Sequence, residues 1–213
     1  MMSWQDEIFE EKSLWAVFRK AYGVTGSSTN TWVVLAVTAL LVSTIGADLY
    51  FDIDQVTQTT FIVAVRLWAE VGVVFAASIL GFLLTGFSIF ATMTRNELFV
   101  ALANIPHKKG NISRLKFVFF NFLIVFIIYL TFLVLCLAVS LLLSKGAPMT
   151  LLIGEVTKDS PWVQYVLGAA AWVIVGSFFA EVLVMLKSFI WNLYQAVLLA
   201  IATEAELEKQ STR

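Results

Sequence analysis

Four long apolar stretches, separated by short polar segments, dominate the pattern of hydrophobic and polar positions along the chain. They cover residues 31–50, 67–93, 117–143 and 162–186. An α-helix rises 1.5 Å per residue, so each stretch is long enough to cross a hydrocarbon core of roughly 30 Å. The pattern predicts an all-α membrane protein with a four-helix transmembrane domain over residues 31–187.

Helical periodicity continues on both sides of this domain. In residues 1–30, large apolar side chains share one side of a helix, at Trp4, Ile8, Trp15, Phe18 and Tyr22. This predicts an N-terminal amphipathic helix, lying either in the membrane interface or against its own bundle. In residues 188–213 the apolar residues keep a heptad-like spacing. This predicts a helical cytoplasmic tail beyond the membrane.

The third and fourth spans differ in side-chain size. Residues 117–143 are rich in Phe, Ile and Leu, which favours a position facing lipid. Residues 168–171 read GAAA and are followed by Gly176. Small residues let helices approach closely in lipid, so the fourth span is expected to pack tightly against a neighbour.

A stripe of small and hydroxyl residues runs along the second span. Its members recur at steps of three or four positions and therefore share one helix face. They are Ser78, Gly81, Thr85, Ser88 and Thr92. Close helix packing and contact with water in a pore are both consistent with this stripe, and the two agree if copies of the helix meet around an axis.

The basic residues are distributed unevenly, which predicts an orientation. With four spans, eleven of the 14 Lys and Arg residues fall on the side that holds both termini and the 94–116 loop. Basic residues in short loops favour the cytoplasm. The chain is therefore expected to be a multi-pass protein of the inner or plasma membrane, with both termini and this loop in the cytoplasm.

Composition limits the classes of function. Hydrophobic residues make up 60% of the chain and charged residues 14%, with one Cys and one His. The sequence contains no phosphate-binding Gly-rich loop, no HExxH and no GxSxG pattern. We therefore expect no enzymatic activity, no catalytic residue, no metal or cofactor, and no nucleic-acid partner.

Acidic residues within the apolar stretches lie toward their ends. Glu70 precedes the apolar run that starts at Val71, and Glu181 follows the run that ends at Ala180. Both are therefore expected near the membrane interfaces. Because proton-coupled transport usually needs a charged group inside the membrane, a small transporter is disfavoured.

These features together favour a homo-oligomeric ion channel or pore-forming effector, with the second span lining the axis. Glu70 and Arg95 would lie at the two mouths of the pore. The candidates for an apolar gate are Phe82, Phe87 and Phe90. Four spans in one chain cannot easily enclose a water-filled path, so the hypothesis requires oligomerisation.

A basic cluster in the 94–116 loop supports an alternative function. Its members are Lys108, Lys109, Arg114 and Lys116. Such a cluster attracts anionic lipid headgroups or an acidic cytosolic protein, besides fixing topology. The chain would then be a membrane anchor or scaffold that recruits a cytosolic partner.

The orientation can be tested with reporter fusions. Reporters placed after Arg213 and within residues 104–112 should report the cytoplasm. Reporters within residues 52–58 and 146–158 should report the opposite side. The distribution of basic residues is the physical reason. A fusion after Arg213 that reports the outside would contradict the orientation and the placement of the basic cluster.

Overall fold

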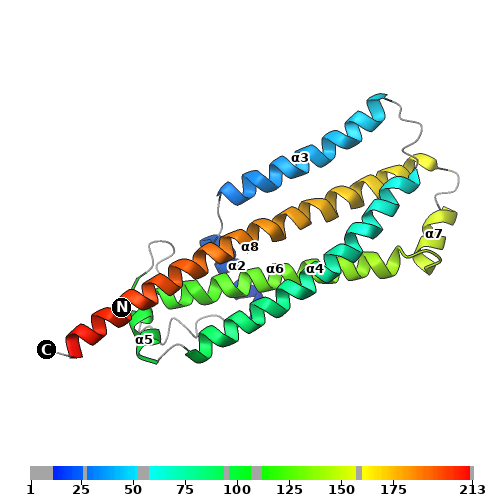
Figure 1. The fold of residues 1–213 in the computed structure, drawn as a ribbon. Helices are drawn as coiled ribbons and strands as arrows, with labels where there is room; N and C mark the ends of the chain where they lie inside the picture. Colours follow the sequence, from blue (N-terminus) through cyan, green and yellow to red (C-terminus); the bar gives the residue numbers. More distant parts are fainter. Residues whose placement is uncertain are drawn as a thin grey trace. The chain divides into compact units, whose positions relative to one another are not determined.

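The structure is a computed structural model that describes residues 12–25, 28–51, 58–93, 96–106, 112–156 and 160–211. Within these ranges the chain is helical, apart from short turns and one isolated bridge between Pro106 and Ser113. The helices, drawn in Figure 1, are α2 (Leu14–Thr25), α3 (Ser28–Phe51), α4 (Gln58–Met93), α5 (Asn96–Asn104), α6 (Arg114–Leu142), α7 (Pro148–Val156) and α8 (Pro161–Ser211).

Four helices are long and apolar enough to cross a membrane, as the sequence predicts. The candidate spans are Ser28–Tyr50, Phe61–Ile89, Arg114–Leu142 and Trp162–Gln195. Two boundaries differ from the prediction. The second span begins at Phe61 instead of residue 67, because Arg66 and Glu70 lower the hydropathy of this stretch but are good helix formers and do not interrupt α4, which begins at Gln58. The fourth span continues to Gln195 instead of ending at residue 186. Helix α8 then continues unbroken to Ser211, in keeping with the predicted helical extension.

The polar connections contain two short helices. Helix α5 lies in the 94–116 loop, and α7 lies in the connection after α6, where Gly146 adopts a positive φ of 80°. Pro148 at the first position of α7 suits a helix start because its missing N–H would have no partner there. In the N-terminal segment the structure describes α2, whose first turn is capped by the Ser13 hydroxyl. Trp4 and Ile8 lie outside the described residues, and the amphipathic role remains a prediction.

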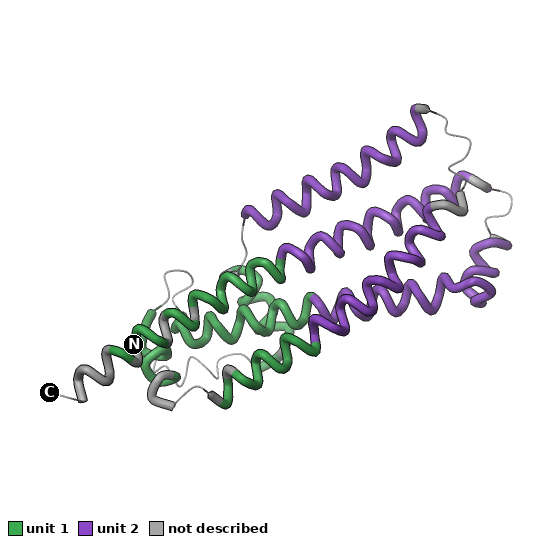
Figure 2. Tube along the Cα trace, viewed as in Figure 1, with its two compact units in different colours: residues 1–27, 81–128, 185–213 green, residues 28–80, 129–184 purple. Residues whose placement is uncertain are grey.

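The chain divides into two compact units, coloured separately in Figure 2. Unit 1 comprises Met1–Ser27, Gly81–Ile128 and Met185–Arg213, and unit 2 comprises Ser28–Leu80 and Tyr129–Val184. Helices α4, α6 and α8 each contribute one part to each unit. The helix–helix contacts of unit 1 and of unit 2 are therefore considered separately.

Close approach at glycines organises unit 2. A Cβ atom added at Gly176 of α8 would lie 2.7 Å from Leu41 Cδ1 of α3. One added at Gly168 would lie 3.2 Å from Phe61 Cβ of α4, and one at Gly72 would lie 2.6 Å from Cys136 Sγ of α6. At Gly72 and Gly176 an added methyl group would force the neighbouring side chain to move, and at Gly168 the neighbour would have to shift by a few tenths of an ångström. The predicted packing face of the fourth span is confirmed at Gly168 and Gly176.

Aromatic side chains organise unit 1. Phe122 of α6 packs edge-to-face on Phe189 of α8, with ring centroids 4.8 Å apart. Next to this contact the Asn192 amide donates a hydrogen bond of 2.9 Å to the Asn121 side-chain oxygen. A smaller apolar cluster of Leu102, Ala103 and Leu115 holds α5 against the start of α6.

The expectation that the third span faces lipid is wrong. In an apolar 18-residue stretch of α6, 39% of the residues are buried, against 28% in the corresponding stretches of α4 and α8 and none in that of α3. Tyr129, Phe132 and Cys136 are fully buried in unit 2. Large side chains are also the ones that fill space beside glycines, so residue size alone does not separate a lipid-facing helix from a central one.

The contact between Gly72 and Cys136 can be tested with a double-mutant cycle. Gly72→Ala should lower the free energy of unfolding by about 1–3 kcal/mol, because the new methyl group overlaps the Cys136 sulfur. Cys136→Ala removes that sulfur and should recover about 0.5–3 kcal/mol of the loss. The measurement is denaturation in mixed detergent micelles.

Gly46→Ala in α3 is the matched control, since no atom lies within 4 Å of a Cβ added there. It should leave stability unchanged or raise it by up to about 1 kcal/mol. Equal effects of Gly72→Ala with and without Cys136 would show that the two residues are not in contact.

Candidate functional site

Helix α4 has a packing face made of small and apolar residues. Its buried positions recur at three- and four-residue steps, at Phe61, Val65, Ala69, Gly72, Ala76, Leu80 and Leu83. At 100° per residue these positions cluster on one side of the helix. The small residues used for packing within the chain are therefore Ala69, Gly72 and Ala76.

The sequence-predicted stripe lies on the opposite side of α4. Ser78, Gly81, Thr85, Ser88 and Thr92 are all exposed. Their mean direction is about 160–200° around the helix from that of the packing face. No atom of the described chain lies within 4 Å of a Cβ added at Gly81 or at the neighbouring Gly86. The stripe therefore makes no close helix contact within the described chain.

The stripe hydroxyls donate hydrogen bonds to their own helix. Ser78 donates to Val74 O at 2.8 Å, Thr85 to Gly81 O at 2.9 Å and Thr92 to Ser88 O at 2.8 Å. This back-bonding satisfies the hydroxyl hydrogens within the helix itself, without an acceptor on another element. It also leaves the oxygen lone pairs directed outward, where they can accept hydrogen bonds from water or a neighbouring helix.

Of the two residues proposed for the pore mouths, the structure describes Glu70. Glu70 is exposed and lies eight positions before Ser78, on the same broad side of α4 as the stripe. Among the described residues it makes no ion pair, including with Arg66 one turn earlier. Arg95 lies outside the described residues.

The three gate candidates occupy different environments. Phe82 is 62% exposed and free to meet another molecule. Phe87 packs edge-to-face on Phe119 and Phe122 of α6, at centroid distances of 5.9 and 5.2 Å. The structure describes the backbone of Phe90 within α4 but not its side chain. Phe82 is therefore the gate candidate that the described geometry leaves available.

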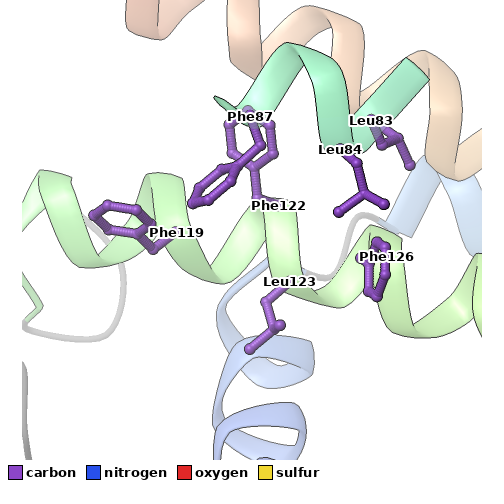
Figure 3. Close-up of a pocket in the computed structure, with 7 residues that line it drawn as sticks. All are labelled: Leu83, Leu84, Phe87, Phe119, Phe122, Leu123 and Phe126. Atoms are coloured by element: carbon purple, nitrogen blue, oxygen red, sulfur yellow. The ribbon is translucent and has the colours of Figure 1, made fainter. Parts of the chain in front are cut away.

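Phe87 also lines an apolar pocket of about 320 Å³ in unit 1. Figure 3 shows the pocket between α4 and α6, lined by Leu83, Leu84, Phe87, Phe119, Phe122, Leu123 and Phe126. All seven side chains are Leu or Phe, so the pocket offers no polar group to orient a substrate. It can accept only an apolar group, such as part of a lipid chain.

The basic cluster is less uniform than the sequence predicts. Lys116 is only 4% exposed, and its ammonium group lies 5.4 Å from the centroid of the Phe120 ring. It is therefore a packed residue of α6 and not a surface charge. Arg114 is partly buried, and its backbone N–H donates to Ile105 O at 2.9 Å, which closes the base of the loop. Lys108 and Lys109 lie outside the described residues.

Sequence reasoning missed the polar contacts between spans in unit 2. The Thr38 and Ser177 hydroxyl oxygens are hydrogen-bonded at 2.8 Å between α3 and α8. The Tyr129 hydroxyl donates to Val182 O at 2.8 Å. Single Ser, Thr and Tyr residues are common in apolar spans, so the pattern gave no signal for these pairs.

Comparison with known proteins provides no template for this arrangement. No protein-family model matches the chain, and no curated protein or solved structure shows significant similarity to it. Four apolar helices are compatible with a membrane protein. Any more specific function has to be inferred from the exposed face of α4 and the polar groups of unit 2.

Proposed function

We propose that the protein is a homo-oligomeric membrane channel or pore-forming effector in which the stripe of α4 lines the axis. The observation that carries this proposal is the separation of two faces on one helix. One face holds Ala69, Gly72 and Ala76 and packs within the chain. The opposite face holds the hydroxyl stripe and is exposed.

The stripe suits a narrow water-filled path for two physical reasons. Its hydroxyl oxygens keep lone pairs that can accept hydrogen bonds from water. Its glycine and other small positions allow copies of α4 to approach one another closely around an axis. An isologous dimer is closed by two-fold symmetry, but a ring of α4 helices around a path requires a higher cyclic order.

The proposed orientation places both termini and the 94–116 loop in the cytoplasm, as the basic residues favour. Phe82 borders the stripe and is the available apolar constriction, which would gate the path by dewetting. Glu70, on the same side of α4, would lie at the outer mouth.

Cysteine accessibility tests whether the stripe meets water. Thr85→Cys and Thr92→Cys, in a Cys136→Ala background, should react with a small water-soluble thiol reagent. Leu84→Cys and Ala91→Cys are matched controls. Each control residue is adjacent in sequence to a test residue, so it lies at nearly the same depth but points 100° away around the helix. All four side chains are exposed in the single chain. Reaction requires water to form thiolate, so the test positions should react on the order of tenfold faster.

Other outcomes of this experiment identify other functions. Equal protection of all four cysteines, in a protein that remains a monomer by native mass spectrometry, would show that the stripe faces lipid. Protection within a stable oligomer that carries no current would show that the stripe only packs. The membrane scaffold with a cytosolic partner would then replace the channel.

Added bulk on the stripe gives an independent prediction. Thr85→Leu and Ser88→Leu should lower single-channel conductance in planar bilayers while the oligomer stays intact, because apolar bulk narrows and dries the path. Ala91→Leu, which adds bulk off the stripe, should leave conductance unchanged. If the two stripe variants instead dissociate the oligomer, then the stripe is a helix-packing surface and not a pore lining.

A further inference from the structure

Glu181 lies deep in the fourth span, contrary to the sequence expectation. The span runs from Trp162 to Gln195, so Glu181 is 19 residues from one end and 14 from the other. These separations correspond to about 28 and 21 Å along the helix. Within the described parts of the four spans no other charged residue is as deep. Glu70 is nine residues from the nearer span end, and Lys187 is eight.

Contacts with α6 place this part of α8 at the level of the span centres. The Tyr129 hydroxyl bonds to Val182 O, next to Glu181, and residue 128 is the centre of the α6 span. Phe75 is the centre of the α4 span, and its ring lies 6.2 Å from that of Tyr129. The centroid of Phe75 is also 5.3 Å from that of Phe179.

The contact with α3 gives the same level independently. Residue 39 is the centre of the α3 span, and the adjacent Thr38 is hydrogen-bonded to Ser177. The centres of the α3, α4 and α6 spans thus meet α8 between Ser177 and Val182, a segment that also contains the centre of the α8 span. Glu181 lies inside this short segment. Its depth therefore does not depend on the exact length assigned to any one span.

The surroundings of Glu181 contain hydroxyl groups but no opposite charge. Ser177 lies one turn earlier on the same face of α8. At this level the described residues of α3 present Thr38 and Leu41, and those of α4 present Trp68 and Phe75. Helix α6 presents Tyr129 next to Val182. Among the described residues of the neighbouring helices, Tyr129 is the titratable side chain at this level of α8.

The Glu181 carboxyl group itself has no partner in the described chain. It is half-buried and makes no hydrogen bond or ion pair with any described residue. Lys187 is six positions further along α8, which places it about 120° around the helix, and it is exposed. Its long stem can carry its ammonium group toward an interface, whereas the shorter Glu side chain reaches much less far.

An ionised carboxylate in this position is unfavourable, because hydrocarbon does not solvate it and no cation neutralises it. Binding a proton removes the charge. We propose that Glu181 is an intramembrane proton-binding site, in which the carboxyl group carries a bound proton beside the Thr38–Ser177 hydroxyl pair. The site is built from contacts within one chain, so it does not depend on the proposed pore.

Carbodiimide labelling in liposomes tests the proposal. A carbodiimide modifies a carboxyl group that carries a proton, and dicyclohexylcarbodiimide partitions into the membrane while a water-soluble analogue does not. Mass spectrometry at neutral pH should find the Glu181 adduct on the order of tenfold or more enriched with the hydrophobic reagent. Glu155, exposed on α7 outside the four spans, should show the opposite preference.

Two variants and one measurement on the unmodified protein complete the test. Glu181→Gln should abolish the hydrophobic adduct, and Glu155→Gln should leave it unchanged. If Glu181→Gln does not fold, infrared spectroscopy of the wild-type protein still tests the proposal. The measurement follows the C=O band of a protonated carboxyl group as the pH is changed. Absence of that band at neutral pH would overturn the proposal. So would labelling of Glu181 and Glu155 with the same reagent preference.

Discussion

Close approach between helix backbones is the constraint on which the rest of this structure depends. Lipid chains are as apolar as Leu and Phe, so moving such side chains from lipid to protein gives no hydrophobic drive for association. The remaining drive includes dispersion contacts, which fall off steeply when a gap opens. Gly72, Gly168 and Gly176 allow Cys136, Phe61 and Leu41 to come within contact distance. The contacts at Gly72 and Gly168 determine which side of α4 is buried and therefore which side remains exposed.

Small residues serve two purposes on α4. Ala69, Gly72 and Ala76 meet other helices of the same chain, whereas Gly81 and the other small residues of the stripe are exposed, and no described atom lies within 4 Å of a Cβ added at Gly81. Both groups look alike in a sequence. The second group is accompanied by hydroxyl residues that already donate to their own helix carbonyls, so a further partner is needed only for their oxygen lone pairs. That combination is what makes the exposed face suitable for water or for another copy.

The polar groups inside the spans of unit 2 are mostly paired with one another. Thr38 bonds to Ser177, Tyr129 to Val182, and Tyr165 donates to the Asp48 carboxylate at 2.7 Å. Such pairing is expected where water is absent and an unsatisfied polar group is costly. Among the described residues two groups depart from this pattern: Glu181, and the buried Arg66 Nε, which lies much closer to a span end. A polar group that lacks a partner where its neighbours have one is a candidate functional residue. Carboxyl groups inside a membrane are strong candidates of this kind.

The number of spans, their approximate positions and the hydroxyl stripe follow from the sequence alone, because hydropathy over about 20 residues and a three-to-four-residue period are local properties. Which face of a helix is buried and which is exposed depends on residues far apart in the sequence. Many bulky residues of α6 were expected in lipid and are buried within the two units, and Lys116 was expected at the surface and is buried against Phe120. Glu181 was expected at an interface because it ends an uncharged run. Its depth is set by the residues that α8 meets on α3, α4 and α6, and only the tertiary structure brings those residues together.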